Sequence, residues 1–194
     1  MLVEWAMAEL MRHPETMAKA QEEVRRVLLK GYTQPEENNE LRFLNLVIKE
    51  TFRLHPPTPL IPRLCRESCT VQGYTIQSGT RVTINTWALG RDPLYWGDDA
   101  ESFKPERFDR SSVDLKGTNF EFLPFGAGRR ICPGITYASA NIKLALARLL
   151  LCFDWQLPHG MKPEDLDMTE TFAANTCRKQ DLYLVATPYA DAPI

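Results

Sequence analysis

The sequence has 194 residues, of which 44% are hydrophobic and 25% are charged, and its formal net charge is -2. This length suits roughly one globular domain, and the apolar fraction excludes a disordered chain. The weak negative charge excludes a strongly basic surface for nucleic acid, and the longest apolar run, residues 144–153, is too short to span a bilayer.

The first part of the sequence is predicted to be helical. Apolar residues at helical spacing begin at Leu2 without a preceding capping residue, so we expect the sequence to start within an element of a longer chain. This helix should end near His13, because the residue before a proline disfavours helical geometry, and Pro14 suits the first turn of a second helix. We expect the second helix to stop at Gly31 and a third helix to cover residues 41–54.

Short strands, a long loop and one strong helix are predicted for the rest of the chain. Residues 70–87 alternate between apolar and polar side chains and contain turn-forming glycines, which predicts a small antiparallel sheet. Residues 90–128 are rich in proline, aspartate, glycine and aromatic residues, and a loop of this length is typical of a functional segment. The strongest helical pattern covers residues 133–152, and strands are expected at residues 153–157 and 182–187.

The segment with the most chemistry is residues 125–134, Phe-Gly-Ala-Gly-Arg-Arg-Ile-Cys-Pro-Gly. Its glycines let a flat or bulky group approach the backbone closely, and Pro133 is expected at the first position of the following helix. The helix N-terminus and the charges of Arg129 and Arg130 stabilise a thiolate at Cys132. The pattern therefore predicts an anionic sulfur beside a cavity.

Four roles remain open for such a sulfur: catalytic nucleophile, redox sensor, metal ligand and inert cysteine. A nucleophile requires a base, and the three histidines, at positions 13, 55 and 159, have no supporting sequence context. The loop lacks the Gly-Lys-Ser/Thr of a phosphate-binding loop, and Ile131 stands where a dinucleotide-binding fingerprint needs its third glycine. The five cysteines lack C-x-x-C spacing, so reduced thiols are expected rather than a disulfide framework or a zinc site.

Five positions of this loop, Phe125, Gly128, Arg130, Cys132 and Gly134, resemble the haem-binding signature of the cytochrome P450 superfamily, the haem-thiolate monooxygenases. The resemblance implies that these positions form the cofactor site, with Cys132 as the axial ligand of the iron in haem b. It also implies that Arg130 pairs with a haem propionate and that Phe125 keeps water from the sulfur. The implied fold is mainly α with small antiparallel β-sheets, and residues 1–194 would form a single incomplete domain.

Two further segments resemble family motifs. Glu50 and Arg53 lie one turn apart on the third predicted helix, and residues 105–108, Pro-Glu-Arg-Phe, resemble the family segment whose arginine completes a buried triad. The resemblance implies that Arg107 joins Glu50 and Arg53 in this structural triad. Arg63 resembles the arginine that contacts the second haem propionate; the alternative is an exposed arginine in a proline-rich turn.

The substrate pocket is the least specific part of the resemblance. Residues 58–62 and residues 172–176 resemble family segments that line the pocket, which makes Leu60, Ile61, Phe172 and Ala173 the candidate lining residues. The alternative for both segments is core packing or a turn.

The residues that stand in these motifs resemble those of the plant microsomal A-type branch of the family. The resemblance implies insertion of one oxygen atom from O2 into an apolar small molecule, expected to be a plant specialised metabolite. Electrons would come from NADPH-cytochrome reductase, with Arg129 as a candidate contact, at the cytosolic face of the endoplasmic reticulum membrane.

The family's membrane anchor and the oxygen-binding segment with its acid–alcohol pair are expected to lie outside these 194 residues, so no catalytic residue is expected within them. One alternative is a truncated, catalytically silent product that binds haem weakly or not at all. Another is an unrelated, thiol-regulated interaction module.

Overall fold

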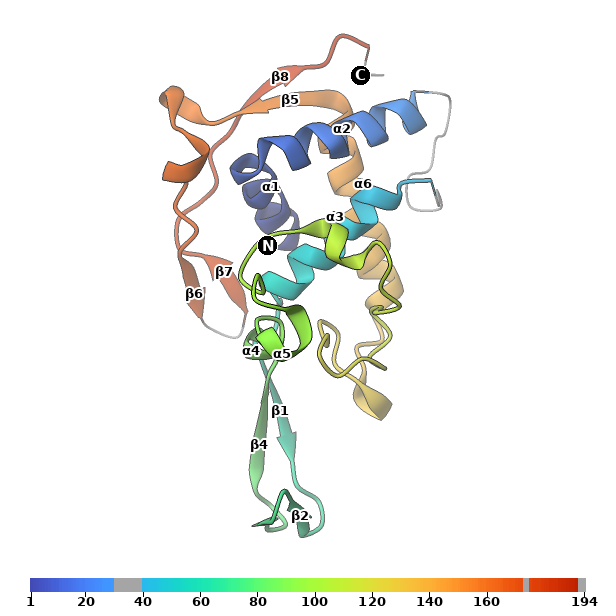
Figure 1. Cartoon of the computed structure of the whole chain (residues 1–194), viewed down its shortest axis with the longest axis vertical. Helices are drawn as coiled ribbons and strands as arrows, with labels where there is room; N and C mark the ends of the chain where they lie inside the picture. The colour runs from blue at the N-terminus through green and yellow to red at the C-terminus, as the bar shows by residue number, and fades with distance from the viewer. Residues whose placement is uncertain (30–39, 173–174, 192–194) are drawn as a thin grey trace.

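The computed structural model describes residues 1–29, 40–172 and 175–191. The body of the structure consists of longer helices that each contact all the others (Figure 1). These helices are α1 (Leu2–Arg12), α2 (Pro14–Leu28), α3 (Arg42–Leu54) and α6 (Ile135–Cys152).

Prolines set the boundaries of the first three helices. His13 has φ -123° and ψ 77°, which separates α1 from α2, and Pro14 occupies the first turn of α2. In the same way α3 ends at Leu54, and His55 adopts a non-helical conformation before Pro56. These boundaries confirm the prediction, whereas the expected helix stop at Gly31 lies outside the described residues.

The hydrophobic core lies between these four helices. Leu10 of α1, Val24 of α2, Leu44 of α3 and Leu150 of α6 are all fully buried. Among the described residues, α6 is the one helix whose length and composition would allow it to cross a membrane. It contacts α1, α2 and α3, and its buried residues are Lys143, Leu146, Ala147, Leu150 and Leu151.

The strands form small antiparallel pairs, as predicted for this fold class. β1 and β4 extend away from the helices, and β2 and β3 lie at the far end of this ladder (Figure 1). β5 pairs with β8, and β6 pairs with β7. The strand bounds are β1 (Leu60–Leu64), β2 (Cys69–Val71), β3 (Tyr74–Ile76), β4 (Arg81–Asn85), β5 (Phe153–Gln156), β6 (Glu170–Phe172), β7 (Thr176–Arg178) and β8 (Val185–Pro188).

The prediction of one sheet across residues 70–87 is corrected by the pairing of β4. This strand pairs with β1, which the sequence analysis had placed in a pocket segment rather than a strand. The reason is Pro62, which lies inside β1 and removes a backbone donor, so the segment lacks the usual strand signal.

The long loop of residues 90–128 contains short helices and supplies aromatic side chains to the core. The rings of Trp96, Phe108 and Phe122 contact one another with centroid separations of 5.3 to 6.1 Å. The short helices of the chain are α4 (Thr86–Leu89), α5 (Pro93–Trp96), η1 (Pro105–Phe108), η2 (Gly128–Arg130), η3 (Pro158–Gly160) and η4 (Pro163–Asp165).

The start of the strongest predicted helix is also corrected. α6 begins at Ile135 with Gly134 as its N-cap, so Pro133 lies in the preceding turn and not at the first helical position. The reason is the backbone of Gly134, whose φ of -83° and ψ of 8° are not α-helical, so the helix cannot begin before Ile135. The Cys132 amide N–H donates to the Phe125 carbonyl at 2.9 Å and closes the preceding loop.

Candidate functional site

The loop that carries Cys132 is held by its own backbone. Besides the closing bond between Cys132 and Phe125, the amide of Ile131 donates to the Gly128 carbonyl at 3.1 Å. Gly126 and Gly128 have φ values of 73° and 67°, in the left-handed region that favours glycine. These turns leave the Cys132 side chain exposed at the surface of the loop.

A hollow of about 290 Å³ lies in front of this sulfur. On one side is the cysteine loop, and on the other is β1, where Ile61 and Arg63 lie two positions apart and so share a face of the strand. The structure therefore brings together Arg63, Phe125, Arg130 and Cys132, which are well separated in the sequence. The lining residues are Pro57, Thr58, Ile61, Arg63, Pro124, Phe125, Gly126, Arg130 and Cys132.

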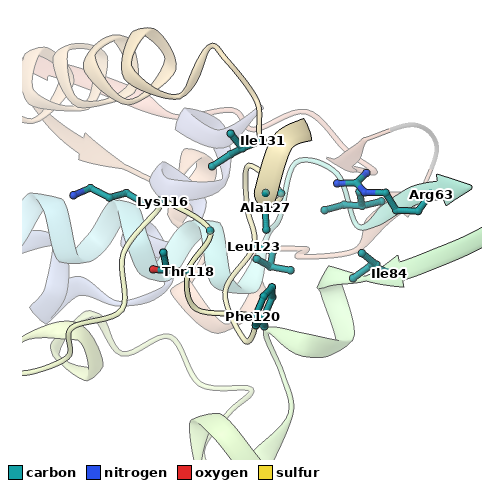
Figure 2. A pocket seen from close by; sticks show the side chains of 12 residues that line it. Arg63, Ile84, Lys116, Thr118, Phe120, Leu123, Ala127 and Ile131 are labelled. Carbon is teal, nitrogen blue, oxygen red and sulfur yellow. The ribbon is translucent and has the colours of Figure 1, made fainter. Parts of the chain in front are cut away.

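A second hollow of about 650 Å³ shares the lining residues Ile61, Arg63 and Gly126 with the first and therefore lies next to it. Figure 2 shows Arg63 and Ile84 reaching toward it from the β1–β4 ladder, with Phe120 and Ile131 on the loop side. Its lining is mainly apolar. Among the described residues that line either hollow, none is acidic.

Two guanidinium groups face the first hollow with few partners from the protein. Arg130 is exposed, and no carboxylate of the described residues pairs with it. Arg63 is half-buried, and its Nη1 donates a 2.9 Å hydrogen bond to the carbonyl of the adjacent Pro62. The hollow therefore has a positive charge at its edge and a sulfur within it, between apolar walls.

This arrangement fits a flat, apolar macrocycle that carries two carboxylates and a metal with affinity for sulfur, which is the chemistry of haem. Among the described residues there is no group of three or more His, Cys, Asp or Glu side chains that could hold a metal ion. Two glycines of the cysteine loop, Gly126 and Gly134, lie close to the arginine and the sulfur that line this hollow. A Cβ at Gly126 would lie 3.5 Å from Arg63 Nη2, and one at Gly134 would lie 3.7 Å from Cys132 Sγ.

Glu50 and Arg53 form a bidentate ion pair beneath this site. Arg53 donates from Nε and Nη2 to the two Glu50 oxygens, each at 2.7 Å, and both side chains are fully buried. Arg107 on η1 donates from Nε to Glu50 Oε1 at 3.3 Å, and the Lys104 amide donates to the same oxygen at 2.8 Å. The three residues predicted as a triad therefore contact one another, and they join α3 to the long loop.

The remaining donors of Arg53 also stay within the protein. They reach the carbonyls of Gly90, Ala100 and Ser102. Gly90 lies so close to α3 that a Cβ there would overlap the Arg53 carbonyl oxygen. The buried charge of Arg53 thus has a full set of acceptors, as a buried ion requires.

Asp99 extends this network at the surface. It accepts hydrogen bonds from Lys104 and Arg107, and these lower the pKa of Asp99 to about 2. Arg107 Nη1 lies 2.9 Å from Asp99 Oδ1, so Arg107 is held between a buried and an exposed carboxylate.

The predicted pocket residues are only partly brought to the hollow. Ile61 lines both hollows, whereas Leu60 is 52% exposed and lines neither, because neighbouring residues of a strand face opposite sides. The backbone of Phe172 pairs with Thr176 in the β6–β7 ladder. Ala173 lies outside the described residues.

The sequence analysis missed a buried charged cluster around His55. The ring stacks on Trp5 at 3.9 Å, its Nε2 lies 2.7 Å from Glu9 Oε1, and its Nδ1 lies 2.9 Å from Glu170 Oε1. Burial alone would raise the pKa of Glu170, but hydrogen bonds from His55 and Trp87 outweigh burial and lower it. No spacing pattern signals this cluster, because its members come from both ends of the chain.

Comparison with known proteins identifies the class. The family described as Cytochrome P450 matches residues 1–182, and the chain therefore belongs to this family. Membership of this family implies a haem cofactor. The predicted resemblance and the predicted fold class are thereby confirmed.

Individual relatives are plant oxygenases. The chain is 60% identical over 188 residues to premnaspirodiene oxygenase of Hyoscyamus muticus. The aligned region covers 95% of this chain and 37% of the relative. It is 58% identical over 187 residues to 5-epiaristolochene 1,3-dihydroxylase of Nicotiana tabacum, with the same coverage. It is also 57% identical over 187 residues, again with this coverage, to desmethyl-deoxy-podophyllotoxin synthase of Sinopodophyllum hexandrum. The chain thus spans little more than a third of the length of these curated relatives.

Proposed function

We propose that this chain is the haem-holding part of a monooxygenase that inserts one oxygen atom from O2 into an apolar small molecule. The observation that carries the proposal is the hollow lined jointly by Cys132, Arg63 and Arg130, where a sulfur faces the same space as two guanidinium groups. In this arrangement the Cys132 sulfur would hold the iron of haem b, and the two arginines would hold its two propionates.

The haem, when bound, supplies the redox chemistry and the O2 binding that protein side chains lack. The chain's own residues hold and shield it. Phe125 packs against Phe52 of α3, with ring centroids 5.1 Å apart, and this contact fixes it beside the sulfur. Phe125 and Ile61 limit the access of water, and Gly128 and Gly134 leave the macrocycle room to approach the loop.

The Glu50, Arg53 and Arg107 network has a structural role in this proposal. Among the described residues, none of the three lines either hollow. They position the long loop against α3, and α3 in turn carries Phe52 and precedes β1. The network therefore acts on the site by fixing the elements around it.

The substrate is proposed to be an apolar plant specialised metabolite. Two relatives are named after the compounds on which they act, a diene in one case and an alkene in the other. The names of both compounds indicate apolar hydrocarbons. Ile61 is the pocket residue with the strongest support, and we propose that Phe172 and Ala173 complete the lining. Electrons would come from NADPH-cytochrome reductase at the endoplasmic reticulum membrane, with exposed Arg129 as a contact.

A second candidate is a catalytically silent product that corresponds to the same part of the enzyme. This candidate and the proposed function differ in whether the described site holds haem through its thiolate.

A spectroscopic experiment distinguishes them. The purified chain is mixed with haem, reduced and exposed to CO, and the red-shifted Soret band of a thiolate-ligated haem is recorded. The proposal expects this band in the parent and in Cys177→Ser, which alters another exposed thiol, and expects its loss in Cys132→Ser. A band that survives Cys132→Ser contradicts the ligand assignment, and a folded parent that shows no band supports the silent product.

A further inference from the structure

A pair of thiols lies at the far end of the β1–β4 ladder, away from the proposed haem site (Figure 1). Cys65 directly follows β1, and Cys69 is the first residue of β2. Their sulfur atoms are 3.9 Å apart, Cys69 is exposed, and Cys65 is half-exposed. Both thiols are therefore within reach of each other and of small solutes.

The backbone at both cysteines is fixed. The Cys65 amide donates to the Thr80 carbonyl at 2.9 Å, and its carbonyl accepts from the Gly79 amide at 2.8 Å. Cys69 is paired with Ile76 in the β2–β3 ladder. The short separation of the two sulfurs is thus a property of two anchored backbone positions.

The connection between the cysteines is also held. Ser78 Oγ donates to the Arg66 carbonyl at 2.8 Å, and the Ser78 amide donates to Ser68 Oγ at 3.1 Å. These bonds tie the three-residue connection to the turn after β3. A disulfide has an S–S length of about 2.05 Å, so closure requires the two sulfurs, now 3.9 Å apart, to approach each other by roughly 2 Å.

The surroundings favour thiol exchange over metal binding. Among the described residues no third His, Cys, Asp or Glu joins the pair to form a metal-binding group. Burial, and then the hydrogen bond with Cys69, raise the pKa of Cys65, which keeps this thiol protonated near neutral pH. The more exposed Cys69 is then the sulfur that an incoming solute meets first.

We propose that Cys65 and Cys69 form a redox-sensitive dithiol that closes reversibly to a disulfide with glutathione disulfide, a low-molecular-weight disulfide, as the oxidant. The Cys69 thiolate attacks one sulfur of glutathione disulfide, which forms a mixed disulfide and releases one glutathione. Cys65 then gives its proton to the departing glutathione, and its sulfur attacks the Cys69 sulfur, which breaks the mixed disulfide and releases the second glutathione. Two protein thiols are oxidised, one glutathione disulfide is reduced, and the two thiol protons end on the two glutathiones.

The inference is independent of the proposed monooxygenase function, because neither cysteine lines the hollow at Cys132. It refines the expectation that all five thiols are simply reduced. It also concerns the strand that carries Arg63, since Ile61, Arg63 and Cys65 follow one another at alternate positions. Closure would restrain the outer end of this strand.

The test uses the whole 194-residue chain in buffers of reduced and oxidised glutathione, quenched with acid, alkylated and mapped by mass spectrometry. We expect a cross-linked species, two hydrogens lighter, whose bond joins Cys65 to Cys69 and which dithiothreitol reverses. The ratio of the Cys65–Cys69 disulfide to the mixed disulfide equals the effective concentration of one thiol at the other divided by the glutathione concentration. With an effective concentration on the order of 1 mM and ~0.1 mM glutathione, this ratio is about ten. The ratio of the closed to the open form should rise in proportion to the concentration of glutathione disulfide divided by the square of the glutathione concentration.

Single-cysteine variants complete the test. Cys65→Ser should stop at the mixed disulfide on Cys69, whereas Cys177→Ser should close like the parent. Circular dichroism checks that each variant is folded. Independent alkylation of both thiols at every glutathione ratio, a parent that stops at the mixed disulfide, or a bond to another cysteine would each overturn the proposal.

Discussion

The network around Arg53 and the hollow around Cys132 both contain guanidinium groups, but the protein surrounds these groups differently. Arg53 is 1% exposed, and its donors reach Glu50 and three backbone carbonyls. Arg130 is exposed at the edge of the hollow, and no carboxylate of the described residues pairs with it. Removing one partner of a buried charge is costly, so Arg53 is committed to the fold. Arg130 remains available to a ligand.

The comparison predicts its largest effect at the buried network. Arg53→Leu leaves Glu50 buried without its partner, and we expect the free energy of unfolding to fall by about 3–5 kcal/mol. Urea denaturation followed by circular dichroism measures this. Arg42→Leu, at an exposed position of the same helix, should change the value by at most about 0.5 kcal/mol. Equal stabilities of the two variants would mean that the buried pair does not support the fold.

A second prediction concerns ligand affinity at the hollow. A hydrogen bond to a charged group contributes about 1.5–3 kcal/mol, so Arg130→Gln should weaken haem binding by roughly 10- to 100-fold. Its unfolding free energy should stay unchanged. Absorbance titration with haem gives the affinity. Arg129→Gln is the matched control, because Arg129 lines neither hollow; equal losses in both variants would contradict a specific role for Arg130.

Alanine substitutions at Gly90, beside the Arg53 network, and at Gly134, beside Cys132, compare how closely the two regions are packed. Alanine at Gly90 would press on the Arg53 carbonyl, and such overpacking costs about 1–3 kcal/mol. Alanine at Gly134 would meet only Cys132 Sγ at an ordinary contact distance, and the stability should change by less than about 0.5 kcal/mol. Thermal or urea unfolding of both variants measures the difference. A larger loss in Gly134→Ala would reverse the comparison.

The smallest effect is the response of the network's surface to acid. Hydrogen bonds from Lys104 and Arg107 lower the pKa of Asp99 to about 2. Because the carboxylate of Asp99 has a lower pKa in the folded than in the unfolded protein, its ionisation stabilises the fold at every pH above the unfolded pKa. This stability is lost as the pH falls towards the folded pKa of about 2. Asp99→Asn should therefore show a shallower loss of stability between about pH 4 and about pH 2. Urea midpoints measured across this range test the prediction, and identical slopes in parent and variant would refute it.

Much of the helical body could be predicted because its signals are local. Pro14 and Pro56 end helices through steric effects on the residue before them. The spacing of residues 125–134 indicated a cysteine loop. The pairing of β1 with β4 could not be predicted, because Pro62 obscures the strand pattern and the partner lies about twenty residues later. Likewise, nothing near Cys65 indicates that its sulfur lies 3.9 Å from that of Cys69.

By itself, the sequence determined where helices begin and end and where the glycine-rich cysteine loop lies, because steric limits and backbone freedom act within a few residues. Only the tertiary structure decided which charges are buried and which face a hollow. Desolvation depends on what packs against a group, as when Trp5 Nε1 donates to the Thr176 carbonyl from the opposite end of the chain. For the same reason, Glu50 became part of the fold while Arg130 stayed open to a ligand.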